Sequence, residues 1–145
     1  LEDWERKAFA SLPWDDETYR QELELPGLVG EEGYTTIERK WARPTLDVNG
    51  IFGGYMGEGS KTIIPAWSGV KITMRLVPNQ DNRTISRLFR EYIQSITPKT
   101  VKLSFKNHHG GGPVLVPRDA RFMDEAVEAM RYGFDHEPCF IREGG

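Results

Sequence analysis

Residues 58–78 contain the side chains whose types and spacing are best suited to chemistry. Arg75 lies on the polar side of an alternating segment that ends at Pro78, and Thr62 stands before a proline that cannot donate to a sheet ladder. A guanidinium offers a planar fork of N–H donors that fits a carboxylate. The pattern allows Arg75 to bind an anionic group and leaves the Thr62 hydroxyl accessible. The alternation of apolar and polar residues is also compatible with Arg75 as an ordinary surface arginine in contact with solvent.

The histidines and the cysteine are the other groups that could do chemistry. His108 and His109 are adjacent, His136 is the only other histidine, and Cys139 is the only cysteine. Zinc sites need three or four ligands at workable spacing, and adjacent strand residues point to opposite sides. We therefore interpret the histidines as structural or solvated and expect this chain to bind no metal. We interpret Cys139 as a buried structural thiol.

Composition narrows the class of protein. The chain has 145 residues and a net charge of −3 without a basic run, which argues against nucleic acid as a partner. It has neither a stretch of about 18 apolar residues nor a signal-peptide pattern, so we expect no membrane association. A single cysteine fits a reducing, cytoplasmic compartment. Because the chain starts at Leu1 without a methionine and stops at two glycines, we expect both ends to be cut points.

The elements that position Arg75 lie between residues 45 and 109. Apolar positions predict a strand near 45–51, a long alternating strand over 63–77, and a third strand at 101–105. Between the last two strands, a stripe at helical spacing predicts a helix over 81–96. This order indicates an antiparallel sheet that is covered on one face.

Helices are expected on both sides of this core. Short helices are predicted over 2–10, 16–23 and 35–41, with Asp15 as an N-cap and with a capping box formed by Thr35 and Glu38. A further helix is expected after a cap at Asp119, followed by a possible strand at 138–141. The fold class is therefore α+β, and residues 1–43 are expected to be a helical extension.

Four motifs in order carry a resemblance to a known family. They are Trp41–Ile51, Lys61–Pro65, Met74–Pro78 and the terminal Arg142-Glu143-Gly144-Gly145. With them the chain resembles the carnosinase-like di-zinc metallopeptidases (peptidase family M20), which include dipeptidases, aminoacylases and succinyl-diaminopimelate desuccinylases. The resemblance is to the lid, or dimerisation domain, and it extends from about residue 12 to the end.

The resemblance implies a fold and a function. The lid is a ferredoxin-like antiparallel sheet with helices on one face, here incomplete, over residues 44–112. Residues 113–145 would begin the returning catalytic domain. The parent would be a homodimeric, zinc-dependent hydrolase of dipeptides or N-acyl amino acids, in which two zinc ions activate water.

The resemblance also implies roles for individual residues. Arg75 matches the lid residue that grips the substrate carboxylate, and Thr62 matches another substrate-binding residue at the dimer interface. No catalytic residue or metal ligand is carried over to this chain, which is expected to be inactive alone. The alternative is a non-catalytic α/β module that dimerises or binds RNA on its sheet face; such a reader needs paired aromatic residues and a basic rim.

Overall fold

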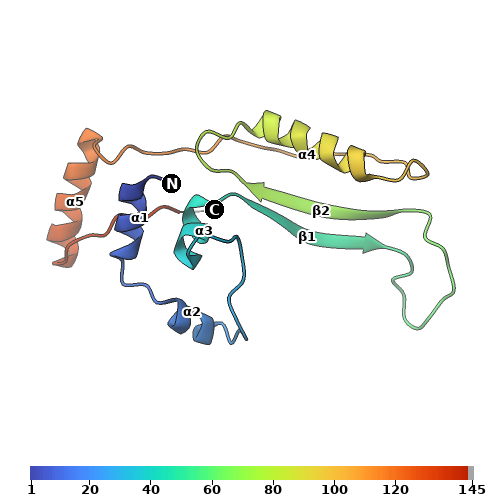
Figure 1. Ribbon diagram of the computed structural model, residues 1–145, viewed down its shortest axis with the longest axis horizontal. Coiled ribbons are helices and arrows are strands. Elements are labelled where there is room, and N and C mark those ends of the chain that lie inside the picture. The colour runs from blue at the N-terminus through green and yellow to red at the C-terminus, as the bar shows by residue number, and fades with distance from the viewer. Residues whose placement is uncertain (144–145) are drawn as a thin grey trace. The chain divides into compact units, whose positions relative to one another are not determined.

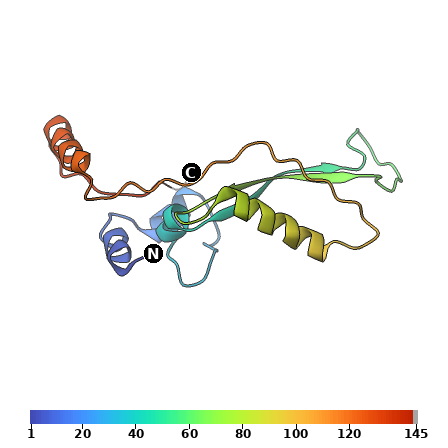
Figure 2. The same ribbon diagram turned by 90° about the horizontal axis from the view of Figure 1, so that it is seen from above.

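An antiparallel hairpin holds the segment around Arg75. It consists of β1 (Thr45–Gly53) and β2 (Ser68–Arg75), joined by a loop over residues 54–67 (Figure 1). In the computed structural model, which describes residues 1–143, residues 44–75 form one compact unit. Residues 1–43 and 76–143 form the other. The two strands run side by side along their whole length in both perpendicular views (Figure 2).

Three short helices precede the hairpin: α1 (Asp3–Ala10), α2 (Asp16–Glu22) and α3 (Thr36–Ala42). Their predicted caps are confirmed, because Asp15 accepts the backbone N–H of Thr18 and Thr35 forms the capping box with Glu38. The buried core among the described residues lies here. It consists of Phe9, Ile37 and Ala42, with Leu12, Trp14 and Trp41 packed against it.

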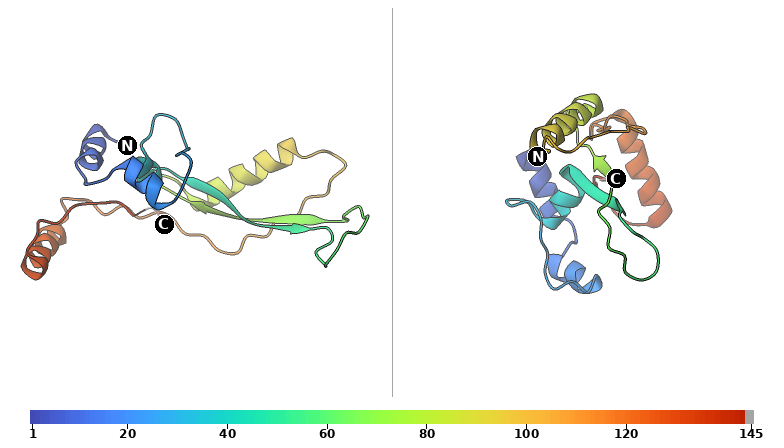
Figure 3. Two further views of the ribbon diagram at one scale, coloured as in Figure 1. Left: turned by 90° about the horizontal axis from the view of Figure 1, so that it is seen from below. Right: turned by 90° about the vertical axis from the view of Figure 1, so that its right-hand side faces the viewer.

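Two longer helices follow the hairpin: α4 (Asn82–Ile96) and α5 (Arg121–Phe134) (Figure 3). The Asp81 carboxylate caps α4 by accepting the N–H of Thr84 at 2.8 Å. The chain after α4 turns back along it. The Arg90 guanidinium lies 5.0 Å from the Phe105 ring, and Asn107 donates to the Ser86 hydroxyl at 2.8 Å.

The sheet is smaller than the sequence predicts. The α+β class is confirmed, but the strands expected at 101–105 and 138–141 are absent among the described residues, whose only sheet is the β1–β2 pair. A strand needs a neighbouring backbone to satisfy its N–H and C=O groups, and residues 101–109 have no hydrogen-bonded partner strand. The long strand is also shorter than expected, since residues 63–67 belong to the loop.

The start of α5 differs from the expectation too. The N-cap is Ala120, which makes no side-chain cap, so the predicted cap at Asp119 is wrong by one position. Alanine has no acceptor to offer the first-turn N–H groups. Along the part of the chain that the structure describes, none of the helices combines the length and the apolarity that crossing a membrane requires.

Candidate functional site: the polar face of the hairpin

The register of the hairpin sorts its side chains into two faces. Thr45 pairs with Arg75 and Val48 with Ile72, but Gly50 pairs with Lys71, so Asn49 is an extra residue in β1. This β-bulge changes the phase of the strand. Apolar side chains from both sides of the bulge therefore share one face: Leu46, Val48, Ile51, Val70, Ile72 and Met74.

The opposite face, which we call the polar face, consists of Thr45, Asp47, Asn49, Gly50, Phe52, Gly69, Lys71, Thr73 and Arg75. Two side-chain hydrogen bonds organise it. The Asn49 amide donates to the Thr73 hydroxyl at 2.9 Å, and the Thr45 hydroxyl donates to the Asp47 carboxylate at 2.8 Å. The Lys71 stem lies over Gly50, where an added Cβ would be 3.1 Å from the lysine Cδ.

Arg75 ends β2 on this face, as the alternation predicts, and its side chain is exposed. Within residues 1–143 its guanidinium makes no ion pair, although Asp47 is its diagonal neighbour across the strands. Its fork of N–H donors is therefore available. The chemistry open to such a group is bidentate binding of a carboxylate or a phosphate.

Thr62 lies at the other end of the hairpin. It belongs to the loop over residues 54–67, which extends beyond the paired strands (Figure 3). Arg75 is at the opposite end of β2, away from the Gly53–Ser68 pair. Seven residue steps separate Ser68 from Arg75, which is about 23 Å of strand. The structure leaves Thr62 exposed but does not bring it together with Arg75.

Aromatic side chains organise the loop end of the hairpin. The rings of Phe52 and Trp67 meet edge to face with centroids 5.8 Å apart, and the Lys61 ammonium lies 5.5 Å from the Tyr55 ring. The Tyr55 hydroxyl donates to the Glu58 carbonyl at 3.2 Å. Ile64, two residues after Thr62, is 96% exposed.

The other candidates from the sequence come together in no site. Among residues 1–143, no three His, Cys, Asp or Glu side chains converge as metal ligands would. Cys139 is exposed, so its interpretation as a buried thiol is wrong. Its neighbours Pro138 and Phe140 are only partly buried, and no partner strand covers them. Of the terminal motif, Gly144 and Gly145 lie outside the described residues.

Sequence reasoning missed two features of residues 1–43. One is a pair of buried carboxylates: Glu38 accepts from Arg6 at 2.9 Å, and Glu5 accepts from Arg142. Their partners lie 32 and 137 residues away in the sequence. A local sequence pattern cannot predict pairs with such separations.

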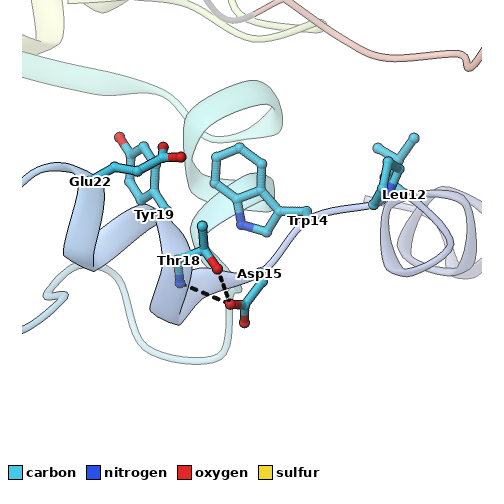
Figure 4. Close-up of a pocket in the computed structure, with 7 residues that line it drawn as sticks. Leu12, Trp14, Asp15, Thr18, Tyr19 and Glu22 are labelled. Carbon is cyan, nitrogen blue, oxygen red and sulfur yellow. Dashed lines mark hydrogen bonds between the residues drawn. The ribbon is translucent and has the colours of Figure 1, made fainter.

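The second feature is an open pocket lined by residues 12–15 and by α2 (Figure 4). It includes Trp14 and Tyr19, whose ring centroids lie 5.0 Å apart. The Thr18 hydroxyl and backbone N–H both donate to Asp15 there, which holds the pKa of that carboxyl below its usual value. The aromatic side chains could have been a signal, but nothing in their spacing distinguishes them from core residues.

Comparison with known proteins decides the family. The family model of the M20 peptidase dimerisation domain matches residues 6–101, which is more than half of the chain. The chain belongs to this family. The match covers the hairpin, α4, α2, α3 and the second part of α1.

Relatives of this dimerisation domain are dipeptidases. The Cys-Gly metallodipeptidase of Schizosaccharomyces pombe is 36% identical over 76% of the chain, which spans 24% of that protein. The human Beta-Ala-His dipeptidase is 24% identical over 99% of the chain and 29% of its own length. The domain thus spans about a quarter of the length of the curated relatives it matches.

Solved structures share the fold of the dimerisation domain. An M20 family metallo-carboxypeptidase from Sulfolobus solfataricus is similar over 99% of this chain and 32% of its own, with a TM-score of 0.83 and 27% identity. Human carnosine dipeptidase 1 gives a TM-score of 0.81 at 24% identity, covering all of this chain and 31% of its own.

Proposed function

We propose that this chain is the lid and dimerisation segment of a zinc-dependent, homodimeric hydrolase of dipeptides or N-acyl amino acids, in which Arg75 binds the terminal carboxylate of the substrate. The family match and the Cys-Gly and Beta-Ala-His dipeptidase relatives support the substrate class. A cytoplasmic location, expected from the single cysteine, belongs to the same proposal.

The observation that carries the proposal is the state of Arg75. It stands at the end of a strand, exposed, on a face that also offers Lys71, and within the described residues no carboxylate occupies its donors. Binding the far carboxylate would fix the orientation of the scissile bond. Residues 1–143 offer no set of metal ligands, so the zinc ions would be held by other parts of the longer protein.

Thr62 would serve the same reaction from a second copy of the chain. An extended dipeptide spans about 7 Å, whereas about 23 Å of strand lies between Arg75 and the loop that holds Thr62. One substrate therefore contacts both residues only if they come from different protomers. The exposed Ile64 and Trp67 beside Thr62 are apolar surface that a partner would cover.

The same proposal divides the chain into three parts of the longer protein. Residues 1–43 would be the helical extension of the lid, residues 44–112 its core, and residues 113–145 the start of the returning catalytic segment. The compact unit that begins at Pro44 supports the first of these boundaries.

RNA binding on the sheet face is the less favoured function. A sheet that reads RNA stacks bases on flat aromatic faces beside a basic rim. Here Phe52 and Trp67 pack edge to face on each other, and Lys71 and Arg75 are the only cations on the polar face.

The test uses the full-length protein that carries this segment. We expect Arg75→Ala to lower kcat/KM for free dipeptides such as Cys-Gly and β-Ala-His by at least about tenfold, because a charge-assisted contact is lost. Arg75→Lys keeps the charge but loses the fork, so its loss should be intermediate. The control substrate is the dipeptide amide, which has no carboxylate and should be hydrolysed equally by all three proteins. Equal losses on acid and amide would overturn the assignment.

A further inference from the structure

We propose that Asn49 is a positioning residue that holds Arg75 in its substrate-binding place, an inference that rests on the function proposed above. Asn49 is the extra residue of the β1 bulge, and its amide donates to the Thr73 hydroxyl at 2.9 Å. Thr73 precedes Arg75 by two residues on the same strand and the same face.

The bulge determines what surrounds Arg75. If the Gly50–Lys71 pairing continued without an extra residue, Leu46 would stand opposite Arg75 and Val48 opposite Thr73. With the bulge, Thr45 and Asp47 occupy these places. The extra residue thus converts an apolar neighbourhood of Arg75 into a polar one.

The hydrogen bond to Thr73 determines where the bulge sits. Keeping Val48 and Ile51 on the same apolar face requires one extra residue between them, but that pattern alone allows either Asn49 or Gly50 to be the extra residue. Only a residue with a polar side chain can hydrogen-bond to the neighbouring strand across the polar face. Asn49 makes this bond, whereas Gly50 has no side chain to make one.

The position of Arg75 depends on the Asn49–Thr73 hydrogen bond because Arg75 is the last residue of β2. Strand ends fray more readily than strand centres, and binding groups must be held within about 0.5 Å of the productive geometry. A side-chain bond two residues before the end restrains the backbone from which Arg75 projects. Asn49 and Thr73 are themselves exposed, so the bond contributes little to a core.

The experiment compares Asn49→Ala, Thr73→Val and the double variant in the full-length protein, with free dipeptides and their C-terminal amides as substrates. We expect each single variant to raise KM for the free dipeptide about fivefold with little change in kcat, since binding of an unreactive group is weakened. The amides should show no change. The double variant should lose no more than the single ones, because both remove the same bond.

Two controls separate positioning from general stability. Thr73→Ser keeps the hydroxyl and should behave as the unsubstituted protein. Asn107→Ala removes a bond of the same chemistry, between Asn107 and Ser86, in the other unit and should leave KM unchanged. If Asn49→Ala does not fold, the isosteric Thr73→Val decides the matter.

The outcomes distinguish this inference from the function it rests on. Unchanged KM values, or equal losses on acids and amides, would show that Asn49 does not position Arg75. If Arg75→Ala discriminates acid from amide while Asn49→Ala and Thr73→Val do not, only the inference fails. If Arg75→Ala itself does not discriminate, both fail.

Discussion

The Arg142 guanidinium donates to the buried Glu5 carboxylate, so α1 is held by a residue 137 positions away in the sequence. Glu5 also accepts the backbone N–H of Glu2 at 2.8 Å. Because Glu5 is only 5% exposed, water cannot replace these donors if they are removed.

Replacement of Arg142 should therefore loosen α1. We expect Arg142→Gln to weaken local stability by about 1–3 kcal/mol, because a buried acceptor loses a hydrogen-bond partner. Amide hydrogen exchange of residues 3–10 measures the effect. Arg121→Gln is the matched control: this side chain is 95% exposed, and its Glu125 partner is 3.8 Å away. If both substitutions alter exchange in α1 equally, the Glu5–Arg142 pair has no special role.

Gly53 should be the least replaceable glycine of the hairpin. It has φ of +144°, and an added Cβ would lie 2.8 Å from the Ser68 Cα across the strands. Because the obstacle includes backbone, we expect Gly53→Ala to cost on the order of 1–3 kcal/mol and to lower the melting temperature. Gly111→Ala, where nothing lies within 4 Å, should melt as the unsubstituted protein does. Equal melting temperatures for both variants would contradict the close approach.

The loop end of the hairpin should control dimerisation. We expect Ile64→Asp to weaken the proposed homodimer at least about tenfold, since a carboxylate buried in an interface without a partner is costly. Sedimentation equilibrium of the full-length protein measures the dissociation constant. Val29→Asp serves as the control, because Val29 is 94% exposed in the other unit. A dimer that tolerates Ile64→Asp would place the interface elsewhere.

Glu17 should titrate far below an ordinary glutamate. Its carboxylate accepts from Arg20 at 2.6 and 2.8 Å and from Gln21 at 2.8 Å, and these bonds, Arg20 first, lower its pKa to about 2. A depressed carboxyl pKa contributes stability above the unfolded value of 4.5, and this contribution is lost as the pH falls toward 2. The group is solvent-exposed, so the effect on α2 should be modest.

An NMR titration of the Glu17 side chain checks this value. Arg20→Gln should return the midpoint toward 4.5, whereas Arg87→Gln, which breaks a similar pair with Glu91 on α4, should not move it. A midpoint near 4.5 in the unsubstituted protein would contradict the hydrogen-bonded geometry.

The parts of the fold that follow from the sequence are those whose causes are local. Asp15, Thr35 and Glu38 mark helix starts within one turn, and the stripe of α4 is contained in its own residues. The prediction of a third strand was wrong because the alternation at 101–105 shows only that these side chains would suit a sheet. Alternation cannot supply the neighbouring strand with which residues 101–105 would have to pair.

The candidate site divides in the same way. The side of β2 from which Arg75 projects follows from a period of two, which any strand obeys. The bulge at Asn49, the bond to Thr73 and the distance to Thr62 depend on how β1 pairs with β2 and where the loop extends. The register depends on how two segments pair that lie 24 residues apart in the sequence. The pattern of either segment alone therefore does not predict it.

The length of β2 has a consequence for how this hairpin can change during evolution. If no second bulge forms, insertion of one residue between Ser68 and Arg75 would turn Arg75 to the apolar face, and insertion of two would return it, about 6.6 Å further along. The complementary strand would have to gain the same two residues to stay paired. Without a further bulge like the one at Asn49, the span between the loop and the arginine is therefore adjustable only in coarse steps of two residues that both strands make together.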